Sequence, residues 1–148
     1  MPATLRRWDV AVKWRYFKHL QCGGDPEAIG VYRWHIAARS GQRFVAGIAT
    51  DQWKRSVDDY VVAAQAVFAS MARDGFNSRY PIQLDPDGEL LGGAHRLAAA
   101  LALGLPSVPC EIAPYKVWAP PWGEAWFQEH MTVAMVDRVR ADWERLKA

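Results

Sequence analysis

The sequence predicts an α+β fold in which a small mixed sheet is flanked by helices within a single domain, residues 1–148. Apolar residues recur at helical spacing in several long segments, whereas residues 80–113 contain short apolar runs bounded by turn residues, which are typical of strands. A chain of 148 residues suits one domain with a substantial core, and we find no repeat or linker that would divide it.

Residues 8–40 predict a pair of antiparallel helices joined by a short loop, added before the central unit. The first helix spans Trp8 to Gln21 and ends at the Gly23-Gly24 pair, and Asp25-Pro26 begins the second, which ends at Gly41. The buried sides are predicted to carry Trp8, Val12, Tyr16 and Leu20 on the first helix and Ile29, Tyr32 and Ile36 on the second, with Lys13, Arg15 and Lys18 largely on other faces.

Residues 44–49 are too short to decide between a strand and an irregular connection. Ser56 to Arg73 has the clearest helical periodicity in the chain, and Gly75 ends it. Near the other end, residues 122–147 predict either one broken helix or two, Glu124–His130 and Met131–Lys147. The second of these is predicted to bury Met135, Val139, Trp143 and Leu146.

The central stretch, residues 80–113, predicts a strand, a turn, a second strand, a short helix and a third strand. The turn is supplied by Pro86-Asp87-Gly88, and the period changes to that of a helix from Ala94 to Leu103, where Ala and Leu predominate. Gly104 ends this helix, and the segment from Val108 to Ile112 resumes an extended chain.

The run Gly92-Gly93-Ala94-His95-Arg96 lies where a strand passes into a helix. Glycines allow the backbone to approach a ligand closely, and the first turn of a helix offers unpaired amides at the positive end of its dipole. His95 and Arg96 add side-chain donors, so the run predicts a phosphate site. The alternative is an ordinary glycine turn with Arg96 as a solvated first-turn residue.

Residues 56–113 resemble the ParB N-terminal and sulfiredoxin-like nucleotide-binding superfamily. The resemblance lies in the order of an amphipathic helix, a Pro-Ile strand, a D-x-D-G turn, a G-x-H-R loop, an Ala-rich helix ending in Leu-Gly, and a Val-Pro strand. It implies a ParB/sulfiredoxin-like core in which the G-x-H-R loop binds the phosphates of ATP or CTP. Mg²⁺ is expected to bridge those phosphates, because it prefers carboxylate, water and phosphate oxygens.

The same resemblance assigns roles to individual residues. It implies that His95 and Arg96 are catalytic and bind phosphate together with Gly92, Gly93 and Ala94. It also implies that Lys54 or Arg55 faces the nucleotide and that the Ser70 hydroxyl contacts it. Without the resemblance, Lys54, Arg55 and Ser70 would be interpreted as solvated surface residues.

The chain departs from two branches of that superfamily. Ala94 stands where sulfiredoxin has its catalytic cysteine, and Cys110 lies on the following strand, where a small buried apolar role is expected. Gly92 stands where the serine-kinase branch usually has an acid. Asp51, Asp85, Asp87 or Glu89 would have to replace that acid, although each also fits an ordinary turn or cap.

A second cluster, Tyr32, Arg33 and His35, is predicted to bind the substrate, with Arg33, Arg39 and Arg43 favouring an anion. Trp34 and His35 lie off the Ile29 and Ile36 stripe, so they would face the central unit or a cleft. The alternative is a packed Trp beside a hydrogen-bonded His.

The composition limits the classes of function. A net charge of +2 and a pI near 8.6 do not indicate nucleic-acid binding, and the chain lacks the segments that a DNA clamp of the resembled superfamily would carry. Eight Trp predict a well-filled core or an interaction surface, and two Cys without metal spacing predict neither a disulfide framework nor a metal site. A cytoplasmic protein without a membrane span is expected.

The leading hypothesis is an ATP-dependent kinase that phosphorylates a small polar metabolite in a biosynthetic pathway. The alternative is a non-catalytic nucleotide-sensing or protein-interaction module, which the missing acid at Gly92 and the many Trp favour. The sequence leaves the acceptor, the choice between ATP and CTP, and the oligomeric state open, and a homodimer is one of the states it allows.

Overall fold

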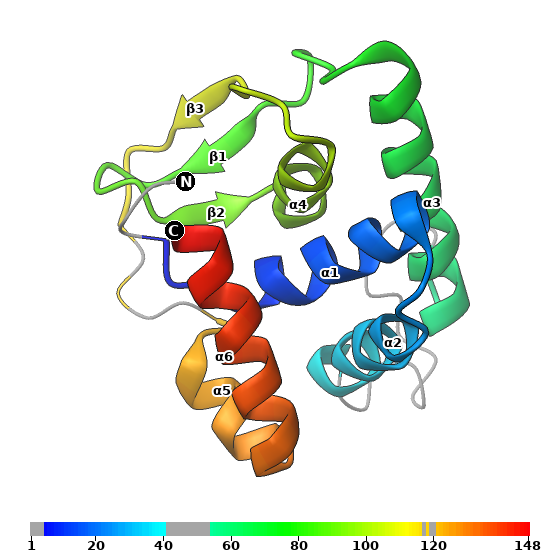
Figure 1. Cartoon of the computed structure of the whole chain (residues 1–148). Coiled ribbons are helices and arrows are strands. Elements are labelled where there is room, and N and C mark those ends of the chain that lie inside the picture. Colours follow the sequence, from blue (N-terminus) through cyan, green and yellow to red (C-terminus); the bar gives the residue numbers. More distant parts are fainter. Residues whose placement is uncertain (1–4, 41–53, 117, 119–120) are drawn as a thin grey trace.

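The computed structural model describes residues 5–40, 54–116, 118 and 121–148. The described part contains six helices and a three-stranded mixed sheet, which confirms the α+β class (Figure 1). The predicted short segment at 44–49, Arg43 and Asp51 lie outside the described residues. No helix in the described part is long and apolar enough to cross a membrane.

The sheet has the strand order β2-β1-β3. Strand β1 (Ile82–Leu84) pairs antiparallel with β2 (Leu90–Gly92) through the predicted turn, and parallel with β3 (Cys110–Ile112). Helix α4 (Ala94–Leu103) makes the crossover from β2 to β3, and its bounds match the predicted ones. The expectation that Cys110 is buried is wrong, because β3 is an edge strand and the thiol is exposed.

Helix α4 lies at the centre of the core, between the sheet, α1 (Asp9–Cys22) and α3 (Val57–Asp74) (Figure 1). The face that packs against its neighbours consists largely of alanines, which let other helices approach closely. Those at 98, 99, 100 and 102 are all buried. Helix α3 begins at a capping box, in which Ser56 accepts from the Asp59 amide and the Asp59 carboxylate accepts from the Ser56 amide.

Helix α1 packs chiefly against α4 and also contacts α2 (Glu27–Ser40) and α6 (Val133–Lys147). Because it is covered on several sides, the prediction that Lys13 and Arg15 lie largely away from the core is wrong, and both side chains are buried. On α2 the predicted buried residues Tyr32 and Ile36 are buried, but Ile29 is 37% exposed.

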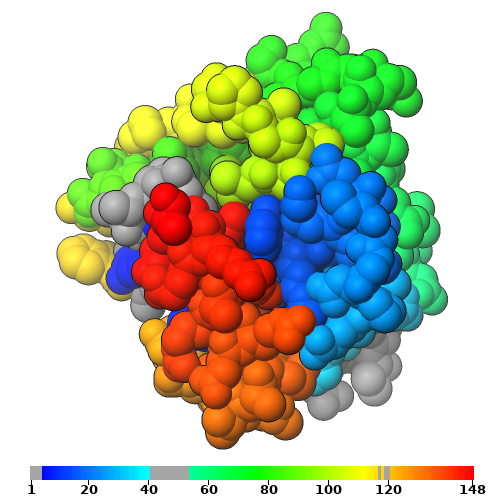
Figure 2. All heavy atoms as spheres, in the orientation of Figure 1, coloured from blue at the N-terminus to red at the C-terminus, as the bar shows by residue number. Residues whose placement is uncertain are grey.

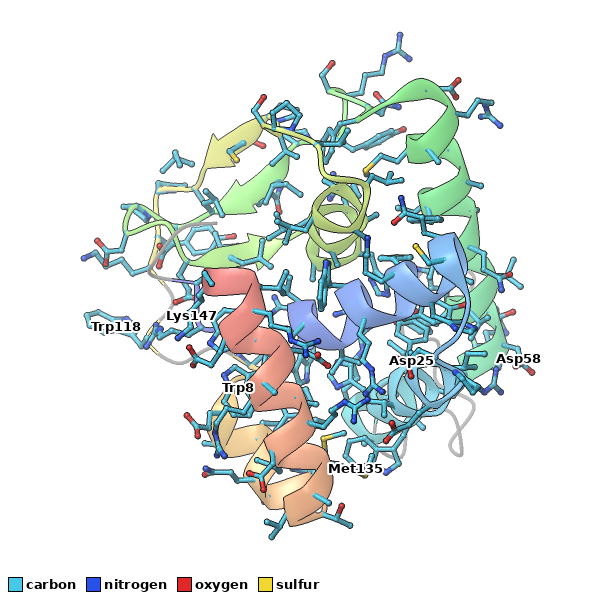
Figure 3. All side chains as sticks on the ribbon, viewed as in Figure 1. Trp8, Asp25, Asp58, Trp118, Met135 and Lys147 are labelled. Atoms are coloured by element: carbon cyan, nitrogen blue, oxygen red, sulfur yellow. The ribbon has the colours of Figure 1, made fainter. Side chains whose placement is uncertain are left out.

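The C-terminal region forms two helices, α5 (Glu124–His130) and α6, separated at Met131 and Thr132. Thr132 caps α6 by accepting a hydrogen bond from the Met135 amide. Most of the described tryptophans are buried or half-buried in the core, as their number led us to expect. Trp118 is the exception, because it is 88% exposed and points away from the molecule (Figure 3).

Candidate functional site

The loop between β2 and α4 turns at Gly93. Its φ of 91° lies in the left-handed region that side chains rarely adopt, and an added Cβ would lie 2.9 Å from Cδ1 of the buried Ile82. The helix therefore starts directly after a residue without a side chain, and α4 has no side-chain cap at this end. Within the described part of the chain, the first amides of α4 have no hydrogen-bond acceptor and are available to a ligand.

A cavity of about 300 Å³ lies in front of this helix end. We call it the α4 cavity. It is enclosed by the first turn of α4, one face of α3 and Lys54 in the segment before α3. Its lining consists of Lys54, Tyr60, Ala63, Ala64, Val67, Gly93, Ala94, His95 and Arg96. Four of the five predicted loop residues thus line one cavity, whereas Gly92 belongs to β2 and is paired with Gln83.

Arg96 has a structural role in addition to any role in ligand binding. Its Nη1 donates hydrogen bonds to the backbone carbonyls of Tyr80 and Pro81, at 3.0 Å for Pro81, and so holds the chain that enters β1. The side chain is half-buried, and this desolvation lowers its pKa below the ordinary value. Arg96 is therefore not the freely solvated residue of the alternative interpretation.

His95 is linked to the N-terminal helices. Its Nε2 lies 2.9 Å from the Tyr32 hydroxyl, which is also 3.3 Å from the Tyr60 carbonyl. The two contacts are satisfied together when Nε2 carries the proton and donates to the Tyr32 oxygen, while Tyr32 donates to the carbonyl. In that tautomer Nδ1 is the acceptor of the imidazole.

His95 is neutral at physiological pH. Desolvation of its ring is the largest cause that holds its pKa well below the usual range, and the charges of Lys13, Arg39 and Lys54 add to the effect. The residue still has part of its surface open, as its place in the cavity lining requires. A neutral imidazole can donate a hydrogen bond from one ring nitrogen and accept one at the other without adding charge to the site.

Behind His95 the protein buries a charged cluster that the sequence analysis missed. Asp9 accepts two hydrogen bonds from Arg7, both at 2.7 Å, and one from Lys13, and all three side chains are almost fully buried. Burial alone would raise the pKa of Asp9, but the ion pairs with Lys13 and Arg7 hold it well below its usual range. Burial lowers the pKa of Lys13 to about 7.

Two residues of α2 extend this cluster. The Arg39 guanidinium lies between two rings, 5.0 Å from the centre of Tyr60 and 4.7 Å from that of Trp122. His35 is fully buried, stacks on Phe127, and has no hydrogen-bond partner for either ring nitrogen among the described residues. Desolvation is the largest cause that lowers the pKa of His35 well below the usual range.

The remaining predicted site residues do not all lie at the α4 cavity. Lys54 lies 4.8 Å from the centre of the Tyr60 ring and lines the α4 cavity, whereas Arg55 is exposed and is not part of the lining. Ser70 lines a neighbouring cavity of about 310 Å³, to which Arg96 also contributes. Of the predicted substrate residues, Tyr32 contacts the loop through His95. Arg33 instead pairs with Asp58 at 2.8 Å, and His35 is buried against Phe127.

The candidate replacement acids within the described residues all have other roles. Asp85 is buried and accepts from the amides of Asp87 and Glu89, so it shapes the turn between β1 and β2. Glu89 is bound by the Arg6 amide and guanidinium, and Asp87 pairs with Lys116. These contacts lie at the end of the hairpin away from Gly93. Asp85 therefore fits the turn alternative, whereas Asp87 and Glu89 form ion pairs.

The sequence gives only a partial indication of the buried cluster of Arg7, Asp9 and Lys13. Asp9 and Lys13 are spaced as an i, i+4 pair, which is usually a surface feature of a helix. Nothing in that spacing shows that the helix is covered on the charged side as well. Among the described residues, no group of three or more His, Cys, Asp or Glu is arranged to hold a metal ion.

No protein-family model, curated protein or solved structure matches this chain.

Proposed function

We propose that this chain binds a nucleoside triphosphate by its phosphates at the N-terminus of α4 and transfers the terminal phosphoryl group to a small polar metabolite. One observation carries the proposal. The uncapped first turn of α4 and the side chains of Lys54, His95 and Arg96 converge on one cavity. Free amides, a helix dipole and basic side chains are the groups that bind phosphate in proteins.

The neighbouring cavity suits the nucleoside. It shares Val67 and Arg96 with the α4 cavity, and its lining includes the apolar side chains of Met71 and Phe76. A nucleotide with its phosphates at Gly93 and its base against Phe76 would occupy both cavities. Ser70 would then lie beside the nucleoside, as the resemblance implies.

Phosphoryl transfer depends mainly on positioning and on cations, because its transition state is loose and needs no protein nucleophile. Lys54 and Arg96 supply positive charge at the α4 cavity. A neutral His95 could accept the proton of an acceptor hydroxyl. The described lining contains no carboxylate, so these residues do not form a magnesium site, and Mg²⁺ would enter as a complex with the phosphates.

The lack of a lining carboxylate among the described residues favours a second candidate, a module that binds nucleotide without using it. In that case ATP or CTP would act as a signal or a structural ligand. The two candidates share the binding site and differ only in whether ADP and a phosphorylated metabolite are formed.

Calorimetric titration of ATP and of CTP tests the shared site. We expect Lys54→Met to weaken nucleotide binding about tenfold to a hundredfold, the cost of one charge-assisted contact. Arg55→Met is the matched control, because it removes the adjacent but exposed cation and should leave the affinity unchanged. Equal affinities in all three proteins would refute the phosphate site.

Variants of Arg96 provide a second test of the phosphate site, because they should change both nucleotide affinity and stability. Arg96→Lys keeps the charge and loses the guanidinium geometry, and Arg96→Ala loses both, so nucleotide affinity should fall in steps. Because Arg96 also bonds to the Tyr80 and Pro81 carbonyls, Arg96→Ala should lower the melting temperature as well.

Incubation of the wild type with ATP, Mg²⁺ and metabolite pools then separates the candidates, since binding without ADP formation supports the module.

A further inference from the structure

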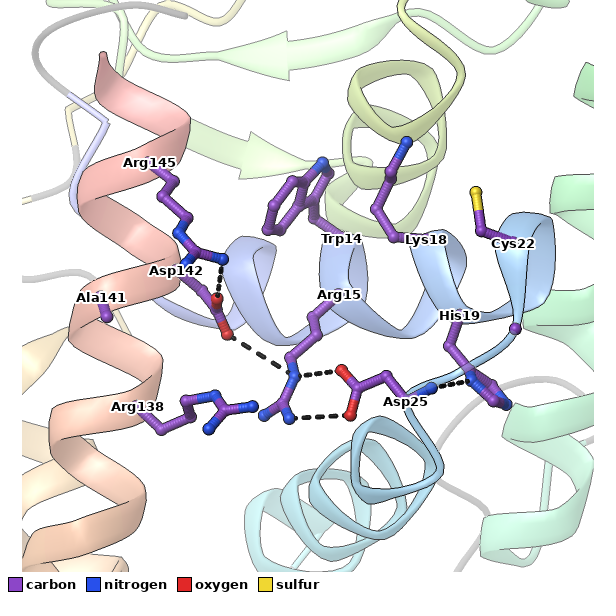
Figure 4. A pocket seen from close by; sticks show the side chains of 11 residues that line it. Trp14, Arg15, Lys18, His19, Cys22, Asp25, Arg138, Ala141, Asp142 and Arg145 are labelled. Atoms are coloured by element: carbon purple, nitrogen blue, oxygen red, sulfur yellow. Dashed lines mark hydrogen bonds and ion pairs between the residues drawn. The ribbon is translucent and has the colours of Figure 1, made fainter.

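A third cavity, of about 510 Å³, lies between α1 and α6. It shares no lining residue with the α4 cavity. Figure 2 shows a hollow in the surface between α6 and the N-terminal helices, and Figure 4 shows the side chains around it. Its volume falls within the range of small-molecule sites, which is roughly 300 to 1,000 Å³.

Arg15 forms the buried wall of this cavity. Its Nε and Nη2 donate to the two carboxylate oxygens of Asp25 at 2.6 and 2.9 Å, and Nη2 also reaches Glu27 at 2.9 Å (Figure 4). Its Nη1 is buried and has no hydrogen-bond partner among the described residues. A buried guanidinium donor without an acceptor is costly, and an anion bound in the cavity could supply one.

The two arginines that α6 contributes to the cavity are weakly paired. Arg138 meets Glu27 at 3.6 Å and Arg145 meets Asp142 at 3.8 Å, and both separations exceed hydrogen-bond distance. Figure 4 shows the end of Arg138 pointing toward Arg15. Counting the lining residues, the basic side chains of Arg15, Lys18, Arg138 and Arg145 outnumber the carboxylates of Asp25 and Asp142.

We propose that this cavity binds a small molecule through an oxyanion group, either a carboxylate or a phosphate, held by Arg138, Arg145 and the free nitrogen of Arg15. Guanidinium groups match the planar geometry of both anions. The half-buried ring of Trp14 and the methyl group of Ala141 are apolar parts of the lining, so the ligand carries an apolar or flat body beside its anionic group.

Calorimetric titration with two probes at constant ionic strength tests the site and distinguishes its ligands. Inorganic phosphate presents the phosphate alone, and benzoate presents a carboxylate with a flat ring for Trp14. We expect at least one probe to bind the wild type. We also expect Arg138→Gln to weaken that probe about tenfold or more, the cost of a lost charge-assisted contact.

Two controls locate the binding. Arg140→Gln removes a guanidinium from the same helix that pairs with Glu124 and Asp137 and does not line the cavity, so it should leave probe affinity unchanged. Arg96→Ala separates the two cavities, because phosphate bound at α4 would be lost in that variant, whereas the probe bound between α1 and α6 should keep its affinity. The proposal is overturned if neither probe binds the wild type, if Arg138→Gln binds like the wild type, or if either control weakens binding equally.

Discussion

At the scale of single residues, Gly92 and Gly93 look alike in the sequence but have different constraints. Gly93 has a φ of 91°, and its Cβ would meet the side chain of the buried Ile82. Gly92 has no such backbone constraint, and the atom nearest to its added Cβ would be Oε1 of Gln83, at 2.8 Å. Gln83 is exposed, so its side chain can move away.

We therefore expect Gly93→Ala to cost roughly 1 to 2 kcal/mol of unfolding free energy from the left-handed backbone alone. It should also weaken ATP binding, because relaxing the turn would move the first amides of α4. Gly92→Ala should have a much smaller effect on both. Urea unfolding and ATP titration of the two variants check this, and equal effects would show that the backbone at Gly93 has no special role.

Lys13 gives a prediction about pH. Its pKa is about 7 in the folded protein against an ordinary 10.5, because burial disfavours the charged form and Arg39 and Arg7 repel it, while Asp9 partly compensates. Between about pH 7 and 10.5 the unfolded chain therefore binds a proton that the folded chain does not. The contribution of Lys13 to stability is smallest below pH 7 and increases as pH rises through this window.

The slope from this one group is at most about 1.4 kcal/mol per pH unit. We expect Lys13→Met to lack this slope, so that the free energy of unfolding increases less between pH 7 and 9 in the variant than in the wild type. Lys18→Met, on the same helix but half-exposed, should keep the wild-type slope. Parallel pH profiles of wild type and Lys13→Met in urea unfolding would contradict the assignment.

At the scale of elements, local signals predicted the helices well, because their ends carry caps and glycines. Helix α3 begins after Ser56 and ends before Gly75, and α4 ends before Gly104, whose φ is 70°. The strands are shorter than predicted, since β1 starts at Ile82 rather than Tyr80 and β3 at Cys110 rather than Val108. Strand ends depend on which neighbour pairs with them, and local sequence does not contain that information.

The candidate site was predictable where one short run supplies it. The residues Gly93 to Arg96 line one cavity because they are contiguous on a turn and a helix end. The environment of His95 was not predictable, because Tyr32 and Lys13 come from distant elements. Periodicity alone predicts Ile29 on the buried face of α2, but periodicity cannot show how far the neighbouring helices extend over that face, and Ile29 is exposed.

At the scale of the whole molecule, the N-terminal helices contribute to the core. Helix α1 packs against α4, and α2 reaches the same helix end through Tyr32. Tyr32 stacks on Tyr16 with ring centres 4.4 Å apart and meets the His95 ring edge-on. The position of the His95 ring at the α4 cavity thus depends on the packing of Tyr32, which lies more than sixty positions earlier in the chain.

This arrangement makes Tyr32→Phe an informative change. The variant keeps the ring and its stacking and removes only the hydroxyl that contacts His95 and the Tyr60 carbonyl. We expect a stability loss on the order of 1 kcal/mol, as for a typical buried hydrogen bond. We also expect ATP affinity to fall, because the imidazole would lose the contact that fixes its tautomer and orientation.

Tyr16→Phe is the matched control, since Tyr16 is also buried and stacked but its hydroxyl contacts only Gln65, at 3.4 Å, among the described residues. It should leave ATP affinity unchanged. Calorimetric titration of both variants, with urea unfolding to measure stability, separates two roles for the N-terminal helices. If Tyr32→Phe loses stability but binds ATP like the wild type, then α2 only supports the core, and His95 is held in place by the loop itself.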